Sequence, residues 1–217
     1  TLSPGSVILL ENLRFHAEEE SNDPDFAAAL ALLADVYVND AFGAAHRSHA
    51  STQGVTRFLP SVAGLLMARE LEILGDALAP PPRPFVAILG GAKVSDKVSI
   101  LHKFAATVDT LVIGGGMVAT FLRAEGYEVG ESPVEDEAVS AAGDLVRAAS
   151  ERRLNLIMPV DLVVADSFSV DASQMIVDVT DVPAGWRIMD IGPRTISSFE
   201  DVLRQAKTVV WNGPMGV

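Results

Sequence analysis

Short, mainly apolar segments alternate along the chain with segments of helical periodicity. Strands with one face in water alternate apolar and polar residues, whereas strands buried on both faces are apolar throughout. The unbroken segments therefore predict an α/β fold, in which parallel strands are connected by crossover helices that cover the sheet. The predicted strands are Val7–Leu10, Val36–Asn39, Phe85–Gly90, Thr110–Gly115, Leu154–Pro159 and Thr208–Asn212. The segments "MIVDVTDVP" and "WRIMDIG" predict shorter strands.

A proline-rich stretch, Ala79–Pro84, is the candidate boundary between two parts of the chain. The stretch before it, Pro60–Ala79, predicts a helix with a broad apolar face, and Pro60 is suited to a helix start. Periodicity alone fits either a helix between two domains or an ordinary core helix. The other predicted helices are Asp25–Asp35, Ser95–Ala106, Met117–Ala124, Glu135–Arg152 and Ser197–Ala206.

Composition restricts the partners of this chain. Its 217 residues are 49% hydrophobic, which is enough to bury a core, and no apolar run approaches the roughly 20 residues that span a bilayer. Neither a secretion signal nor a cysteine is present, which agrees with a cytoplasmic protein. The formal charge of −13 argues against nucleic-acid or membrane partners, so an anionic ligand needs a local basic cluster.

Such a cluster follows the predicted strand at Phe85–Gly90. Gly90 and Gly91 are followed by Lys93 and Lys97, close to the start of a predicted helix. Cations at a helix N-terminus oppose the helix dipole, but they complement a phosphate that binds to the free N–H groups there. The alternative is a solvated lysine pair with Asp96 nearby, and spacing alone favours this alternative slightly.

Two further strand ends are rich in glycine. Gly114–Gly116 follow one predicted strand, where glycines allow a backbone to lie against a flat ring or a phosphate. Asn212, Gly213 and Pro214 follow another. Tight turns explain both stretches equally well, because isolated glycine motifs are weak evidence.

The N-terminal part carries arginines and histidines instead. Arg14 and Arg47 follow predicted strands in an acidic chain, which is typical of a clamp for a carboxylate or phosphate. His46 and His49 are alternative metal ligands, but zinc needs a third ligand and none is evident; loop hydrogen bonding is the simpler role. Asp40 precedes them.

Six separated motifs resemble phosphoglycerate kinases, in the same order and through essentially the whole chain. They are "VILLENLRFHAEEE", "VNDAFGAAHRSHAS", "RPFVAILGGAKVSDKV", "LVIGGGMVATFL", "LIMPVDLVVAD" and "TVVWNGPMGV". The resemblance implies two Rossmann-like parallel-sheet domains joined by an interdomain helix, both incomplete here. The implied parts are residues 1–59 for glycerate binding, 60–82 for the interdomain helix and linker, and 83–217 for nucleotide binding.

The resemblance also implies a glycolytic reaction, in which a phosphoryl group passes from 1,3-bisphosphoglycerate to ADP and gives 3-phosphoglycerate and ATP. Arg14 and Arg47 would bind the glycerate ligand, and Lys97 would stabilise the moving phosphoryl group, so these three would be the catalytic residues. The nucleotide-binding residues would be Gly91, Ala92, Lys93, Lys97, Gly115, Gly116, Asn212, Gly213 and Pro214. Magnesium would arrive with the nucleotide, and the family's magnesium-holding aspartate has no counterpart in this sequence.

Other functions remain open beside this resemblance. The family's first glycerate-binding elements and its last glycine-rich segments have no counterpart here, so a truncated nucleotide-binding module without turnover is the main alternative. A polypeptide of these 217 residues alone is expected to be inactive, and the complete enzyme to be a monomer. A structural protein on the same fold is a second alternative. A dinucleotide-dependent oxidoreductase is a weak third, because Gly114–Thr120 does not form a G-x-G-x-x-G motif.

Overall fold

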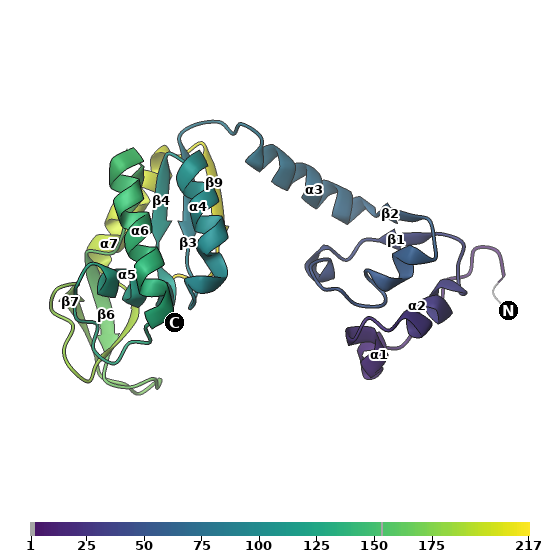
Figure 1. The fold of residues 1–217 in the computed structure, drawn as a ribbon, viewed down its shortest axis with the longest axis horizontal. Coiled ribbons are helices and arrows are strands. Elements are labelled where there is room, and N and C mark those ends of the chain that lie inside the picture. The colour runs from purple at the N-terminus through teal and green to yellow at the C-terminus, as the bar shows by residue number, and fades with distance from the viewer. Residues whose placement is uncertain (1–2, 153) are drawn as a thin grey trace. The chain divides into compact units, whose positions relative to one another are not determined.

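A computed structural model describes residues 3–152 and 154–217, and the chain divides into two compact units. Unit 1 is Thr1–Ala79 and unit 2 is Pro80–Val217. Figure 1 shows both units as ribbons. Of the helices in the described ranges, none combines the length and the apolar character that crossing a bilayer requires.

Unit 1 contains short elements around a two-stranded parallel sheet. Strand β1 (Tyr37–Asn39) pairs with β2 (Ser61–Ala63), and Val38 lies opposite Val62. Helix α2 begins at Pro24, and two residues favour a start there. Proline is suited to the first turn, and the Asp23 carboxylate accepts hydrogen bonds from the amides of Asp25 and Phe26. The helices are α1 (Ala17–Glu20), α2 (Pro24–Ala31) and α3 (Leu65–Leu78), and the 3-10 turns are η1 (Leu13–Phe15), η2 (Phe42–Ala44) and η3 (Gly54–Arg57).

Two predictions for unit 1 are wrong. The helix predicted to start at Pro60 starts at Leu65, because residues 61–63 pair with β1 and become a strand instead. The strand predicted at Val7–Leu10 is not formed, and its residues are exposed. A strand needs a hydrogen-bonded neighbour, and no strand within the described residues pairs with this segment.

Unit 2 is built on a four-stranded parallel sheet in the order β5-β4-β3-β9. The strands are β3 (Phe85–Leu89), β4 (Thr110–Ile113), β5 (Asn155–Ile157) and β9 (Thr208–Asn212). The helices are α4 (Val98–Thr107), α5 (Val118–Ala124), α6 (Asp136–Arg152) and α7 (Pro193–Gln205), with 3-10 turns η4 (Ser95–Lys97) and η5 (Gly115–Met117). The predicted parallel α/β arrangement is therefore confirmed.

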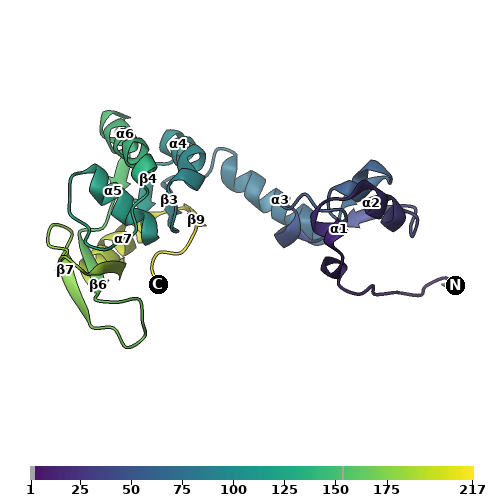
Figure 2. The same cartoon turned by 60° about the horizontal axis from the view of Figure 1, so that its bottom comes forward.

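Helices cover both faces of this sheet, which explains its unbroken apolar strands. Figure 2 shows α4 and α6 on one side of the sheet and α7 on the other. Along β3, Phe85, Ala87 and Leu89 join the larger core under α4 to α6. Val86 and Ile88 join Phe199 of α7 in the smaller core on the opposite face.

A second sheet in unit 2 is antiparallel, which the sequence analysis did not predict. It consists of β6 (Asp161–Ala165), β7 (Gln174–Asp178) and β8 (Arg187–Ile191), in the order β7-β6-β8. Leu162 and Val164 of β6 are fully buried, whereas Ile176 of β7 is 59% exposed. The sequence analysis took unbroken apolar segments as strands of a parallel sheet that is buried on both faces. β7 is an outer strand with an exposed apolar residue, so that rule did not identify this sheet as antiparallel.

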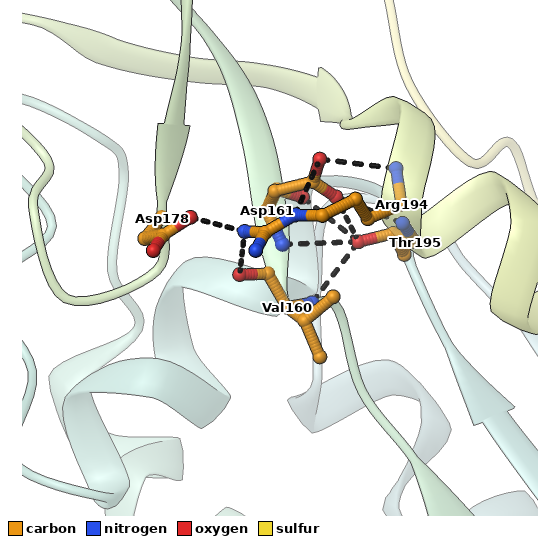
Figure 3. A network of polar contacts seen from close by, with 5 residues as sticks. All are labelled: Val160, Asp161, Asp178, Arg194 and Thr195. Atoms are coloured by element: carbon orange, nitrogen blue, oxygen red, sulfur yellow. Dashed lines mark hydrogen bonds and ion pairs between the residues drawn. The ribbon is translucent and has the colours of Figure 1, made fainter.

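A buried carboxylate joins the antiparallel sheet to α7 (Figure 3). Asp161 accepts hydrogen bonds from the Thr195 amide (2.8 Å), the Thr195 hydroxyl (2.6 Å) and the Arg194 amide (3.0 Å), and Arg194 also pairs with Asp178 of β7. Burial alone would raise the pKa of Asp161, but the bonds from Thr195 and Arg194 lower it below its ordinary value. Asp161 is therefore ionised, and its carboxylate binds the N-terminus of α7.

Candidate functional site

Three loops of unit 2 meet at the carboxyl edge of the parallel sheet, where ligands of open α/β folds bind. They follow β3, β4 and β9 and are joined by backbone hydrogen bonds. The Gly91 amide donates to Pro214 O (2.8 Å), the Gly115 amide to Met215 O (2.9 Å) and the Met117 amide to Gly91 O (2.8 Å). The sequence-predicted residues Gly91, Gly115 and Pro214 are therefore brought together by the fold.

The close approach of these loops explains their glycines. Gly91, Gly115 and Gly213 have φ values of +103°, +67° and +88°, which side chains rarely adopt. A Cβ atom on Gly115 would also lie 2.6 Å from the Gly91 amide nitrogen and would collide with Pro214 O. Gly115 thus packs closely against the backbone of the neighbouring loops, and its predicted contact with a ring or a phosphate stays a prediction.

Donors for an anion remain at this junction. The Gly90 and Gly91 amides are used by carbonyls of Asn212 and Pro214, but within the described ranges the amides of Ala92 and Lys93 donate to no protein acceptor. Lys97 lies at the junction of η4 and α4, and its Nζ donates to Asn212 Oδ1 (2.9 Å). This partner is neutral, and Lys97 forms no ion pair with any described residue, so its charge is available to an anion.

A carboxylate that the sequence analysis missed also contacts this site. Glu135 accepts hydrogen bonds from the amides of Val94 and Ser95 and from the Ser95 hydroxyl. The Ser95 hydroxyl is the main cause of the lowered pKa of Glu135, followed by the two amides and the charge of Lys93. Nothing in the sequence connects Glu135 with Ser95, because they are 40 residues apart and on different elements.

A cavity of about 170 Å³ opens beside the junction. Its walls include Gly91, Ala92, Gly115 and Gly116 from the predicted site, together with Asp190 of β8. The other lining residues carry no charge and are apolar or glycine: Val118, Leu162, Ile188, Met189, Ile191, Pro214 (also a predicted site residue), Met215, Gly216 and Val217. An apolar cavity with few polar groups suits a flat ring better than a phosphate.

In unit 1, the predicted clamp arginines lie on separate segments. Arg14 is in η1, and Arg47 is in the loop after η2; both are exposed. Within the described residues neither guanidinium forms an ion pair, and no hydrogen bond joins the two side chains. Their positive charges are therefore accessible to an anionic ligand.

The loop that carries Arg47 is held by a buried glutamate. Glu19 of α1 is 3% exposed and accepts hydrogen bonds from the Ser51 amide (2.9 Å) and hydroxyl, while its own carbonyl accepts from the Ala50 amide (2.9 Å). The Thr52 hydroxyl donates to Arg47 O (2.7 Å). The backbone that follows Arg47 is thus fixed from within unit 1.

The other polar candidates of unit 1 have structural contacts. His49 Nδ1 lies 3.8 Å from Glu19 Oε1, and Asp40 accepts a hydrogen bond from the Met67 amide (3.0 Å) in the first turn of α3. Residues 3–152 and 154–217 contain no group of three or more His, Cys, Asp or Glu side chains that could hold a metal ion. His46 and His49 therefore gain no third ligand in the described structure.

Comparison with known proteins gives a consistent result. The family model described as phosphoglycerate kinase matches residues 1–217. Curated proteins named phosphoglycerate kinase are 58% identical in Moorella thermoacetica and 56% identical in Chloroflexus aurantiacus, each over 216 residues and 100% of this chain. The chain covers 55% and 54% of these relatives, so it spans about half their length.

Solved structures agree with the sequence relatives. A phosphoglycerate kinase from Coxiella burnetii has a TM-score of 0.84 and 42% identity, with 100% of this chain and 56% of that chain covered. A phosphoglycerate kinase from Pyrococcus horikoshii has a TM-score of 0.80 and 32% identity, with 98% and 56% covered. These findings do not favour the alternative of a nucleotide-binding module without turnover.

Proposed function

The chain belongs to the phosphoglycerate kinase family, and on this basis we propose that it is part of an enzyme that transfers a phosphoryl group from 1,3-bisphosphoglycerate to ADP. The acyl phosphate bond breaks, a bond forms to the terminal oxygen of ADP, and 3-phosphoglycerate and ATP result. The enzyme acts as a monomer in the cytoplasm, without a nucleic-acid or membrane partner.

The nucleotide is assigned to unit 2, the larger part of which is the proposed nucleotide-binding domain of residues 83–217. Its phosphates bind at Gly91, Ala92, Lys93 and Lys97. Gly115 and Gly116 form a wall beside the adenine, and the loop at Asn212, Gly213 and Pro214 closes the nucleotide side. The apolar cavity next to Gly115 and Gly116 supports this arrangement, because it lies beside the free phosphate donors.

The glycerate ligand is assigned to residues 1–59. Arg14 and Arg47 bind its anionic groups, and their exposed, unpaired guanidinium groups support this role. Arginine suits such a ligand because its planar group donates two parallel hydrogen bonds to a carboxylate or phosphate. Residues 60–82 form the helix and linker between the two binding domains in this proposal.

The chemical step depends on position and charge. Phosphoryl transfer needs an in-line arrangement of the two oxygens and neutralisation of the developing charge, and no side chain has to act as a base. Lys97 stabilises the transferring group, while the Ala92 and Lys93 amides orient the phosphates. Arg14 and Arg47 hold the second substrate at its anionic end.

Magnesium belongs to the nucleotide in this proposal. Proteins bind Mg²⁺ mainly through phosphates, waters and one or two carboxylates. No residue of this chain is assigned to the metal. When bound, it would supply positive charge to the nucleotide phosphates.

The observation that carries the proposal is the Lys97 ammonium group, held beside three glycine loops by a neutral amide oxygen. Isothermal titration with ADP, using the protein's complete natural chain, tests the nucleotide site. We expect binding that weakens as ionic strength rises, because the donors are partly exposed. A coupled assay with both substrates tests turnover; absence of both binding and turnover would contradict the proposal.

A further inference from the structure

Glu135 is anchored through both its side chain and its backbone. Its carboxylate accepts hydrogen bonds from the Val94 amide (2.6 Å), the Ser95 amide (3.0 Å) and the Ser95 hydroxyl (2.7 Å). Its own amide donates to Thr120 Oγ1 (3.1 Å), and Thr120 is a fully buried residue of α5. Glu135 therefore connects the segment after β3 with the helix that follows the Gly114–Gly116 loop.

The anchored residues lie between the two lysines of the nucleotide site. Val94 and Ser95 follow Lys93 directly, and η4 places Lys97 at the end of the same short segment. Three hydrogen bonds to one carboxylate restrict the backbone from which both lysines extend. The carboxylate accepts from the Val94 and Ser95 amides, whereas the Ala92 and Lys93 amides donate to no acceptor among the described residues.

We propose that Glu135 is a positioning residue for nucleotide binding, which fixes the Lys93–Lys97 segment so that its lysines and free amides meet the phosphates of ADP. This inference rests on the proposed function of unit 2. Glu135 itself does not touch the nucleotide. It acts through the backbone of Val94 and Ser95.

Electrostatics alone predicts the opposite effect. A carboxylate close to Lys93 reduces the positive potential that an incoming anion meets, so its removal should tighten ADP binding. The lowered pKa shows that Glu135 is ionised at neutral pH, so this repulsive charge is present. The direction of the change in affinity therefore separates positioning from a simple charge effect.

The main experiment compares Glu135→Gln with Glu137→Gln in the protein's complete natural chain. Both variants remove one negative charge, but Glu137 lies exposed on α6, two residues away. We expect Glu135→Gln to weaken ADP binding about tenfold in isothermal titration, the loss typical of a charge-assisted hydrogen bond. Glu137→Gln should bind ADP as the wild type does. Unchanged or tighter binding by Glu135→Gln would overturn the inference.

A second ligand distinguishes positioning from general damage to the fold. Adenosine lacks phosphates, so its affinity should be the same for Glu135→Gln and wild type. An equal loss for ADP and adenosine would overturn the inference in favour of a structural role. If Glu135→Gln does not fold, Ser95→Ala replaces it, because this variant removes only the hydroxyl donor; we expect about threefold weaker ADP binding. An unchanged ADP affinity of Ser95→Ala would then overturn the inference.

The outcomes for the two proposals differ. A wild-type protein that binds no ADP would overturn the proposed function and this inference with it. A wild-type protein that binds ADP, together with a Glu135→Gln variant that binds it equally well, would overturn this inference alone.

Discussion

At the scale of the residue, the proposed nucleotide and glycerate sites depend on a few charges that lack a charged partner. Lys97 contacts a neutral amide, and the guanidinium groups of Arg14 and Arg47 form no ion pair with a described residue. When a charged side chain without a strong internal partner is replaced, the protein loses little free energy of unfolding. Its removal should therefore affect ligand binding more than folding.

Lys97→Ala tests this at the nucleotide site. We expect kcat of the complete enzyme to fall about 100-fold, which corresponds to ~3 kcal/mol of lost transition-state stabilisation. The free energy of unfolding, measured by thermal denaturation, should change by less than about 0.5 kcal/mol. Steady-state kinetics with both substrates measures the effect, and Lys103→Ala, an exposed lysine on α4, is the matched control. Activity near that of wild type would contradict the role of Lys97.

Arg14→Ala and Arg47→Ala test the glycerate assignment. Each variant should raise KM for 3-phosphoglycerate by about tenfold or more, because a charge-assisted contact is lost. ADP affinity should stay within about twofold of wild type, since both arginines belong to unit 1. Calorimetry with ADP and kinetics with 3-phosphoglycerate give the two quantities. Arg57→Ala, also exposed in unit 1, serves as control; a large loss of ADP affinity would refute the division of ligands between units.

At the scale of the element, the sequence predicted what depends on local pattern and missed what depends on distant pairing. The apolar run at Thr208–Asn212 became β9 with the predicted bounds, because its β-branched and aromatic residues favour an extended strand and β3 provides its hydrogen-bonded neighbour. The start of α3 was wrong because residues 61–63 pair with β1. Glu135 was missed as a site residue because only the fold brings it to Ser95.

Gly115→Ala tests the junction of the three glycine loops. A methyl group there meets the Gly91 amide and Pro214 O at a positive φ, so the loops must separate. We expect a loss of about 2–4 kcal/mol of unfolding free energy and weaker ADP binding. Gly143→Ala in α6, where the new methyl has room, should instead stabilise by about 0.5–1 kcal/mol. Urea unfolding compares the two variants, and equal effects would contradict the close packing of the loops.

Asp161→Asn tests the attachment of α7 to β6. The pKa of Asp161 is lowered in the folded protein, so its ionised form stabilises the fold above the unfolded pKa of about 3.9, and this contribution is lost as pH falls through the folded pKa. The variant should be about 2–3 kcal/mol less stable near pH 7. Its deficit relative to wild type should shrink below about pH 4. Thermal unfolding at several pH values measures this, and a deficit independent of pH would refute it.

At the scale of the whole chain, the hydrophobic cores of the two units differ in kind. The buried apolar side chains described in unit 1 are mostly small: Ala27, Ala31, Ala50, Val55 and Met67. Unit 2 buries Phe85, Phe121, Met117 and many aliphatic residues around its sheet. Burial of large side chains contributes more free energy than burial of alanine, so unit 2 should be the more stable unit.

A polypeptide limited to these 217 residues is expected to bind ADP but to show no turnover. Its proposed nucleotide loops belong to the unit with the larger core, whereas Arg14 and Arg47 belong to a unit with a two-stranded sheet and a small core, which is marginal by itself. Calorimetry with ADP and the coupled assay, run beside the complete enzyme, check both parts. Clear turnover by the short polypeptide would require other residues to be assigned to glycerate binding.

The strand order of unit 2 has a consequence for the protein during its synthesis. β3 lies between β4 and β9, and Phe85 pairs with Thr208, far later in the chain. At roughly 5–20 residues per second, a ribosome needs on the order of ten seconds to proceed from β3 to β9. Throughout that time the nascent chain presents an apolar strand with one unpaired edge. Translation that pauses before Thr208 would prolong this exposure, so the speed of the ribosome over this stretch affects how much chain is lost to aggregation.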